Sequence, residues 1–108
     1  MAQNFRRYTS NDVGTSPATL FTSDSYDTIV GISVANVTTT SVIASVYIND
    51  GVNDIYLIKD APIPVGSALQ VLDGGAKFVV QSGDSLKVIS DTASSLDVFV
   101  STVDDISS

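Results

Sequence analysis

The sequence of 108 residues contains no histidine, cysteine, tryptophan or glutamate. Without His or Cys, neither a Ser-His-Asp nor a Cys-His nucleophilic system can be built, and zinc sites made of these ligands are excluded too. The sixteen Ser could take only Lys as a partner base, and no Ser-x-x-Lys spacing occurs. We therefore expect a protein that is not an enzyme and that holds no cofactor or metal.

Positive charge is also scarce, since five Lys and Arg face twelve acids, for a formal net charge of −7 and a pI near 4.1. Binding of nucleic acid or of an anionic membrane surface requires a basic face, so neither partner is expected. No apolar run approaches the roughly 20 residues that span a bilayer. The opening residues do not resemble a signal peptide, which predicts synthesis in the cytoplasm.

The residues that are abundant favour strands. Val, Ile and Thr make up about a third of the chain, and β-branched side chains suit a pleated sheet better than a helix. All twelve acids are Asp, which prefers turns and caps to helix interiors. Helix formers such as Leu, Met and Lys are few by comparison. The composition predicts an all-β protein.

Alternating apolar and polar residues locate the strands. The clearest alternation runs through 26–37 and 42–49, and Asp50-Gly51 then predicts a tight turn into a partner strand at 54–59. Pro62 and Pro64 predict a bend, and Asp73-Gly74-Gly75 predicts another turn. The other expected strands are 18–22, 68–72, 77–81, 86–90 and 96–103.

Eight or so short strands with a turn about every 8–12 residues are typical of a small antiparallel sandwich or barrel. We expect a single β-sandwich, or a partly closed barrel, of about 7–9 strands. It would occupy residues 13–108, and residues 1–12 would form an N-terminal arm. The more apolar phase of each strand predicts a core of Val30, Ile32, Val34, Val42, Ala44, Val46, Leu57, Leu86, Val88, Val98 and Val100.

The arm carries the first set of candidate binding residues. Phe5, Arg6, Arg7 and Tyr8 place two aromatic side chains and both arginines in four consecutive positions. Aromatic residues and Arg dominate interface hot spots, so the arm is predicted to attach the domain to a neighbour. The alternative is that Arg6–Tyr8 forms an edge strand of the same sandwich, with the arginines in solvent.

Tyr47 and Tyr56 form the second candidate set. They flank the predicted 49–54 turn on the face opposite Val46 and Leu57, where they could be cross-strand neighbours. They either shield the outer face of the sheet or offer a contact surface to another subunit.

Two motifs have ordinary structural explanations. The oxygen-rich residues 49–54 could hold calcium, but they lack the spacing and closing Glu of an EF-hand, and a hairpin turn accounts for them. Asn36-Val37-Thr38 fits the glycosylation sequon, and we interpret it as a chance match.

Three longer segments carry a resemblance: 62–69 (PIPVGSAL), 83–90 (GDSLKVIS) and 96–101 (LDVFVS), together with the opening 4–9 (NFRRYT). They resemble the small β-sandwich virion proteins of tailed bacteriophages, especially cyanophages. The resemblance implies a non-enzymatic virion component made in the host cytoplasm, such as a capsid decoration (cement) protein or a head–tail or neck protein.

Its expected partners are capsid, neck or tail subunits and further copies of itself. The alternative is a receptor- or carbohydrate-binding module of a tail or fibre tip, with the loops at 49–54 and 73–76 contacting the ligand.

Overall fold

The computed structural model describes residues 3–23, 26–70 and 78–105. These residues form nine strands, and among them there is no helix of the length and apolarity that crossing a membrane requires. The strands are β1 (Gln3–Val13), β2 (Ala18–Thr22), β3 (Tyr26–Asn36), β4 (Val42–Asn49), β5 (Asp54–Ile63), β6 (Ala68–Gln70), β7 (Phe78–Val80), β8 (Ser85–Ser90) and β9 (Leu96–Asp105).

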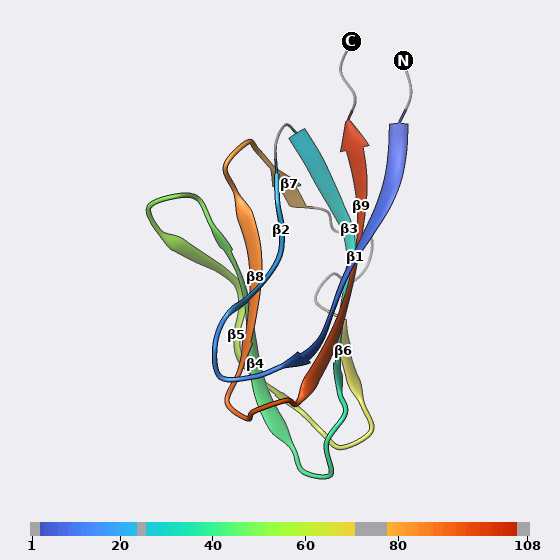
Figure 1. Cartoon of the computed structure of the whole chain (residues 1–108), viewed down its shortest axis with the longest axis vertical. Coiled ribbons are helices and arrows are strands. Elements are labelled where there is room, and N and C mark those ends of the chain that lie inside the picture. Colours follow the sequence, from blue (N-terminus) through green and yellow to red (C-terminus); the bar gives the residue numbers. More distant parts are fainter. Residues whose placement is uncertain (1–2, 24–25, 71–77, 106–108) are drawn as a thin grey trace.

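The strands form two antiparallel sheets packed face to face (Figure 1). Sheet A has the order β1-β9-β3-β6, with β7 on the same edge of β3 as β6, and sheet B has the order β2-β8-β4-β5. The all-β prediction is confirmed, and of the two architectures expected the structure is the sandwich. The strand predicted at 68–72 is β6, which the structure describes as far as Gln70. Residues 71–77, which include the predicted Asp73-Gly74-Gly75 turn, lie outside the described residues.

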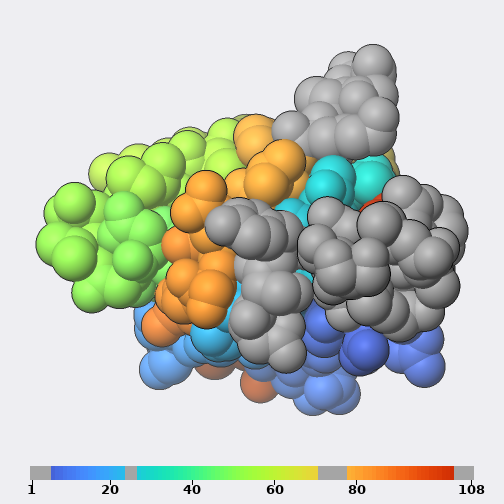
Figure 2. Space-filling model, turned by 90° about the horizontal axis from the view of Figure 1, so that it is seen from above, coloured from blue at the N-terminus to red at the C-terminus, as the bar shows by residue number. Residues whose placement is uncertain are grey.

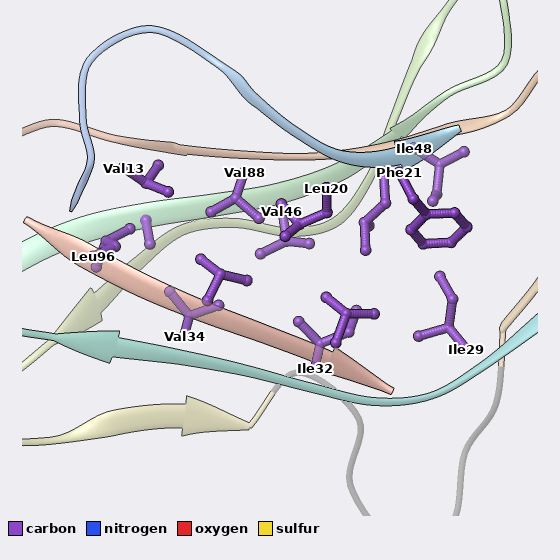
Figure 3. Close-up of a cluster of buried hydrophobic side chains, with 14 of the residues drawn as sticks. Val13, Leu20, Phe21, Ile29, Ile32, Val34, Val46, Ile48, Val88 and Leu96 are labelled. Carbon is purple, nitrogen blue, oxygen red and sulfur yellow. The ribbon is translucent and has the colours of Figure 1, made fainter. Parts of the chain in front are cut away.

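The core lies between the inward phases of the two sheets, where Val46 and Val88 of sheet B face Ile32 and Val34 of sheet A (Figure 3). Removing such side chains from water contributes about 1.5–3 kcal/mol each. All the predicted core residues are buried except Val30 and Leu57, which are partly exposed.

The error at Val30 has a specific cause. The pairing of β3 with β9 shifts register between Ile29 and Gly31. The extra residue of such a bulge reverses which side of the strand the following side chains face. Ile29 is therefore buried in place of Val30, although simple alternation continued back from Ile32 predicts the opposite.

The predicted arm lies in the sandwich. β1 pairs with β9 from Gln3 to Val13, so the edge strand considered as the alternative for Arg6–Tyr8 extends over nearly the whole segment. The backbone of 3–13 is thus an edge strand of sheet A. The pairing partner is at the far end of the chain, and no local pattern in the sequence identifies it.

The hairpin predicted around Asp50-Gly51 is confirmed as β4–β5, with Asn49 opposite Asp54. The second strand is longer than predicted. It continues past Asp60, whose φ is 54° and whose amide donates to Ser45 Oγ at 2.9 Å, and ends at Ile63. Pro62 is tolerated because β5 is an edge strand, where a missing N–H donor can face away from the sheet.

Candidate functional site

Tyr47 and Tyr56 are cross-strand neighbours, as predicted. They lie directly opposite each other in the β4–β5 ladder, with ring centroids 5.0 Å apart and planes tilted by 42°. The ammonium of Lys59 lies 5.0 Å from the centre of the Tyr56 ring, within the range of a cation–π interaction. Tyr47 is only 6% exposed, whereas Tyr56 is 42% exposed. The pair therefore both shields sheet B and leaves one ring accessible.

The environment of Tyr47 keeps its hydroxyl protonated. Burial raises the pKa of Tyr47, and the nearby Asp54 carboxylate and Tyr56 add to the effect. A raised pKa leaves a neutral hydroxyl at all ordinary pH values, because the unperturbed pKa of tyrosine is already about 10. Tyr47 can thus form hydrogen bonds and packing contacts but is not activated as a nucleophile.

The hairpin tip, which we define as residues 49–56, exposes apolar side chains on both of its faces beside the polar residues of the turn. Ile55 lies opposite the buried Ile48, on the core-facing side, yet it is 52% exposed. Val52, in the turn, is 84% exposed. Figures 1 and 2 show the cause: the hairpin projects from the body, so sheet A does not cover the core-facing side of its tip.

The polar side chains of the 49–54 turn form hydrogen bonds within the turn. One carboxylate oxygen of Asp50 accepts the amides of Val52 (3.0 Å) and Asn53 (2.7 Å), and these bonds lower the pKa of Asp50. The Asn49 side chain donates to Asp54 at 2.7 Å and accepts the Gly51 amide at 2.9 Å. Within the part of the chain that the structure describes, no three acidic, His or Cys residues are grouped as metal ligands.

The residues predicted as an attachment cluster lie on β1, where Arg6 and Tyr8 lie on one face and Arg7 on the other. Phe5, Arg6, Arg7 and Tyr8 pair in turn with Val103, Thr102, Ser101 and Val100 of β9. Alternation along a strand therefore places Arg6 on the core-facing side with Tyr8, and Arg7 on the outer side. Both arginines are exposed. The two arginines do not share one face.

Tyr8 instead joins the two sheets. Its ring stacks on Phe21 of β2 at a centroid distance of 4.5 Å and an interplanar angle of 13°. Because β1 belongs to sheet A and β2 to sheet B, this pair closes one side of the sandwich. The contact stabilises the fold, so Tyr8 is a packing residue as well as a predicted binding residue.

A groove that the sequence did not predict lies on the outer face of sheet A. It has a volume of about 400 Å³ and is lined by Thr9, Ser10, Asn11, Ser33, Ala35, Asp97, Val98 and Phe99. Phe99 is 46% exposed in the middle of this face, opposite Thr9 of β1 and Ser33 of β3. The sequence signal was present in Leu96–Val100, where alternation turns Phe99 away from the core.

The glycosylation sequon is explained by the fold. Asn36 is buried, and its amide nitrogen donates to the carbonyls of Thr40 (2.8 Å) and Ile63 (2.9 Å). Its side-chain oxygen accepts the amide and the hydroxyl of Thr38. All the polar atoms of the side chain thus organise the loop after β3, in agreement with the interpretation of the sequon as a chance match.

No protein-family model and no curated protein matches the chain. Among solved structures it is similar to two crystal structures of a pentameric capsid protein isolated from metagenomic phage sequences. The identities are 19% and 18%, with TM-scores of 0.47 and 0.48. The alignments cover 93% of this chain but only 60% and 59% of those chains. At these values the similarity transfers no function to this chain.

Proposed function

We propose that the chain is a non-enzymatic structural protein of a tailed-phage virion, bound to the head shell as a decoration protein or to the neck. The resemblance of residues 62–69, 83–90, 96–101 and 4–9 to small virion sandwich proteins supports the virion assignment. The observation that carries a binding role is the hairpin tip. Its exposed apolar side chains project from a small acidic domain, and such side chains favour burial in a partner.

The tip combines features of an anchor. Val52, Ile55 and Tyr56 are exposed on different sides of one projecting hairpin, so a partner would enclose the tip rather than lie flat against it. The short turn is rigid, since Asp50 and Asn49 are committed to its hydrogen bonds. A rigid anchor loses little conformational entropy on binding.

β1 is the second proposed contact. It is an edge strand of eleven residues, and it carries both arginines of an otherwise acidic chain. Arginine forms charge-assisted hydrogen bonds to carboxylates, and the hairpin tip carries the charges of Asp50 and Asp54, each of which uses only its Oδ1 atom in the hydrogen bonds of the turn described above. Contact between the tip of one copy and β1 of the next would be head-to-tail, a geometry that closes into rings when the rotation permits.

The test is incorporation into particles. Phage would be assembled with Val52→Asp plus Ile55→Asp, and the copies per virion measured by quantitative mass spectrometry. We expect a loss of about tenfold or more in copy number with little change in melting temperature, because exposed apolar residues contribute little to folding but much to an interface. Val79→Asp is the matched control, since Val79 is exposed on β7, away from the tip.

Normal incorporation of the double variant would overturn the role of the tip, and absence of the wild-type chain from purified virions would overturn the virion assignment. The wild-type copy number also separates the two positions, since hundreds of copies indicate the head shell and a small ring number indicates the neck.

Arg7→Glu tests β1 more cleanly than deletion of residues 1–9, because the deletion would also remove most of an edge strand.

A further inference from the structure

We propose that the groove around Phe99 on the outer face of sheet A binds a neutral oligosaccharide. This inference is independent of the virion role, and its site is made of residues other than those of the loops at 49–54 and 73–76 that the sequence suggested. Its evidence is the composition of the groove, the backbone around it and a second hollow beside it.

The groove joins one aromatic ring to a rim of uncharged polar groups. Thr9 and Ser33 flank the half-exposed ring of Phe99 in the outward row, Ser10 and Asn11 complete the polar lining, and the hydroxyl of Ser33 also accepts the Gln70 side-chain amide at 3.1 Å. Hydroxyls and amides both donate and accept hydrogen bonds, as sugar hydroxyls do, and an aromatic ring offers apolar surface to the C–H groups of a pyranose. The volume of about 400 Å³ lies within the range of roughly 300–1,000 Å³ typical of small-molecule sites.

Charge restricts the ligand further. Among the described residues that line the groove there is no Lys or Arg, and Asp97 supplies a carboxylate. One oxygen of that carboxylate accepts the Asp12 amide at 3.3 Å. A phosphorylated, sulfated or sialylated ligand would therefore meet the Asp97 carboxylate inside the groove, while the outward Arg7 lies in the next row of this face, opposite Ser101, and is not one of the lining residues. The lining favours a neutral sugar.

The sheet also disfavours a peptide strand in this groove. β9, which carries Phe99, pairs with β1 at Val98 and Phe99 and with β3 from Leu96 to Phe99, so a peptide strand could add only at the outer edge of β1 and not over the Phe99 ring. An extended peptide that binds by strand addition needs a free sheet edge. A ligand here must be recognised by side chains, as a sugar is.

A β-bulge shapes one wall of the groove. The pairing of β1 with β9 shifts between Ser10 and Val13, and Asp12 adopts a φ of 55°. Bulges aim side chains away from the regular ladder and are frequent beside functional sites. Asn11 lies within this bulge, and the loop at 93–94 packs closely against Gly14, where an added Cβ would lie 3.1 Å from the Ser94 amide.

A second hollow of about 330 Å³ adjoins the groove and shares Ser10 and Asn11 with it. Its other lining residues extend through Gly14 to Ala18 and include Ser94. Two adjoining hollows that share Asn11 fit a ligand of at least two sugar rings, with Asn11 between them. We therefore expect disaccharides to bind better than their component monosaccharides.

The experiment uses the full chain labelled with ¹⁵N and titrated with lactose, maltose, cellobiose or chitobiose to about 50 mM, a concentration that nearly saturates a site even when its Kd is about 1 mM. We expect at least one disaccharide to shift the amides of Thr9, Asn11, Ser33 and Phe99. Phe99→Ala should weaken that binding about tenfold and Asn11→Ala several-fold. Val79→Ala, which alters an exposed apolar residue of the same sheet outside the groove, should leave it unchanged.

Three results would overturn the proposal: no amide shifts with any of the four disaccharides, shifts that gather at Tyr47 and Tyr56, or a stronger response to sialyllactose than to lactose. If Phe99→Ala does not fold, the site is identified from the loss of binding in Asn11→Ala and from the wild-type amides that shift on titration. Because none of these measurements involves virions, the outcome is separate from that of the incorporation test.

Discussion

The outer faces of the two sheets are built in opposite ways. On sheet B, the row Lys87, Tyr47 and Tyr56 fills the face with long side chains, and Tyr47 is almost fully covered. On sheet A, the positions beside Phe99 hold small residues, so the ring stands in a groove. The same alternation of inward and outward residues produces both faces, and only the size of the outward residues differs.

This difference separates packing from recognition. An outward ring that its neighbours cover, such as Tyr47, contributes to the stability of the sheet. An outward ring that its neighbours leave open, such as Phe99, contributes little to stability and is available to a ligand. The two aromatic residues should therefore respond to substitution in opposite ways, in folding and in binding.

The largest effect should come from the core that both sheets share. Val88 is fully buried between the sheets, so Val88→Asp would place an unpaired charge in the interior and should prevent folding. Far-ultraviolet circular dichroism and solubility measure the outcome, with Val79→Asp as the exposed control. A soluble Val88→Asp variant with a native β spectrum would show that β8 does not lie as the structure places it.

The second-largest expected effect is the difference in stability between substitution of the Tyr47 ring and substitution of the Phe99 ring. Tyr47→Ala should lower the free energy of unfolding by about 2–4 kcal/mol, as the loss of a large buried side chain does. Phe99→Ala should change the free energy of unfolding by less than about 1 kcal/mol, since nearly half of its surface is already in water. Urea denaturation of both variants measures the difference. Equal destabilisation would mean that Phe99 is a packing residue and that its exposure carries no functional meaning.

The sequence predicts what is local. Alternation identified the inward residues of β4 and β8, and Asp50-Gly51 fixed a turn short enough to place Tyr47 opposite Tyr56. The Ile29–Gly31 bulge was not predictable, because it is a change of register between two strands that are distant in sequence. The partner of β1 was hidden for the same reason, since β9 is at the other end of the chain.

Prediction of the groove would have required the most long-range information. Its lining comes from β1, β3 and β9, and no sequence motif brings residues of these three strands together. Phe99 could be predicted to face outward, but whether its neighbours would be long or short depended on the register of both flanking strands. Register on this scale is set by the whole sheet rather than by any one segment.

The smallest effect tests whether packing requires small residues on the outer face of sheet A. An added Cβ at Gly31 would meet Ser101 Cβ at 3.9 Å, an ordinary contact, and the backbone there is not left-handed. Glycine within a strand costs roughly 0.5–1 kcal/mol relative to alanine, so Gly31→Ala should stabilise the protein by about that amount. Gly51→Ala is the matched control, since its φ of 96° strains any residue with a Cβ, and it should destabilise.

Both changes can be followed by thermal unfolding, where 1 kcal/mol corresponds to a shift of about 4–8 °C in a domain of this size. If Gly31→Ala is stabilising, the sheet tolerates a larger residue beside Ser101, and packing does not account for the small side chains of this face. That result would strengthen the case for a site around Phe99. If Gly31→Ala destabilises as much as Gly51→Ala does, the bulge at Ile29–Gly31 demands glycine. The small size of the side chains on the outer face of sheet A would then follow from the strand register alone.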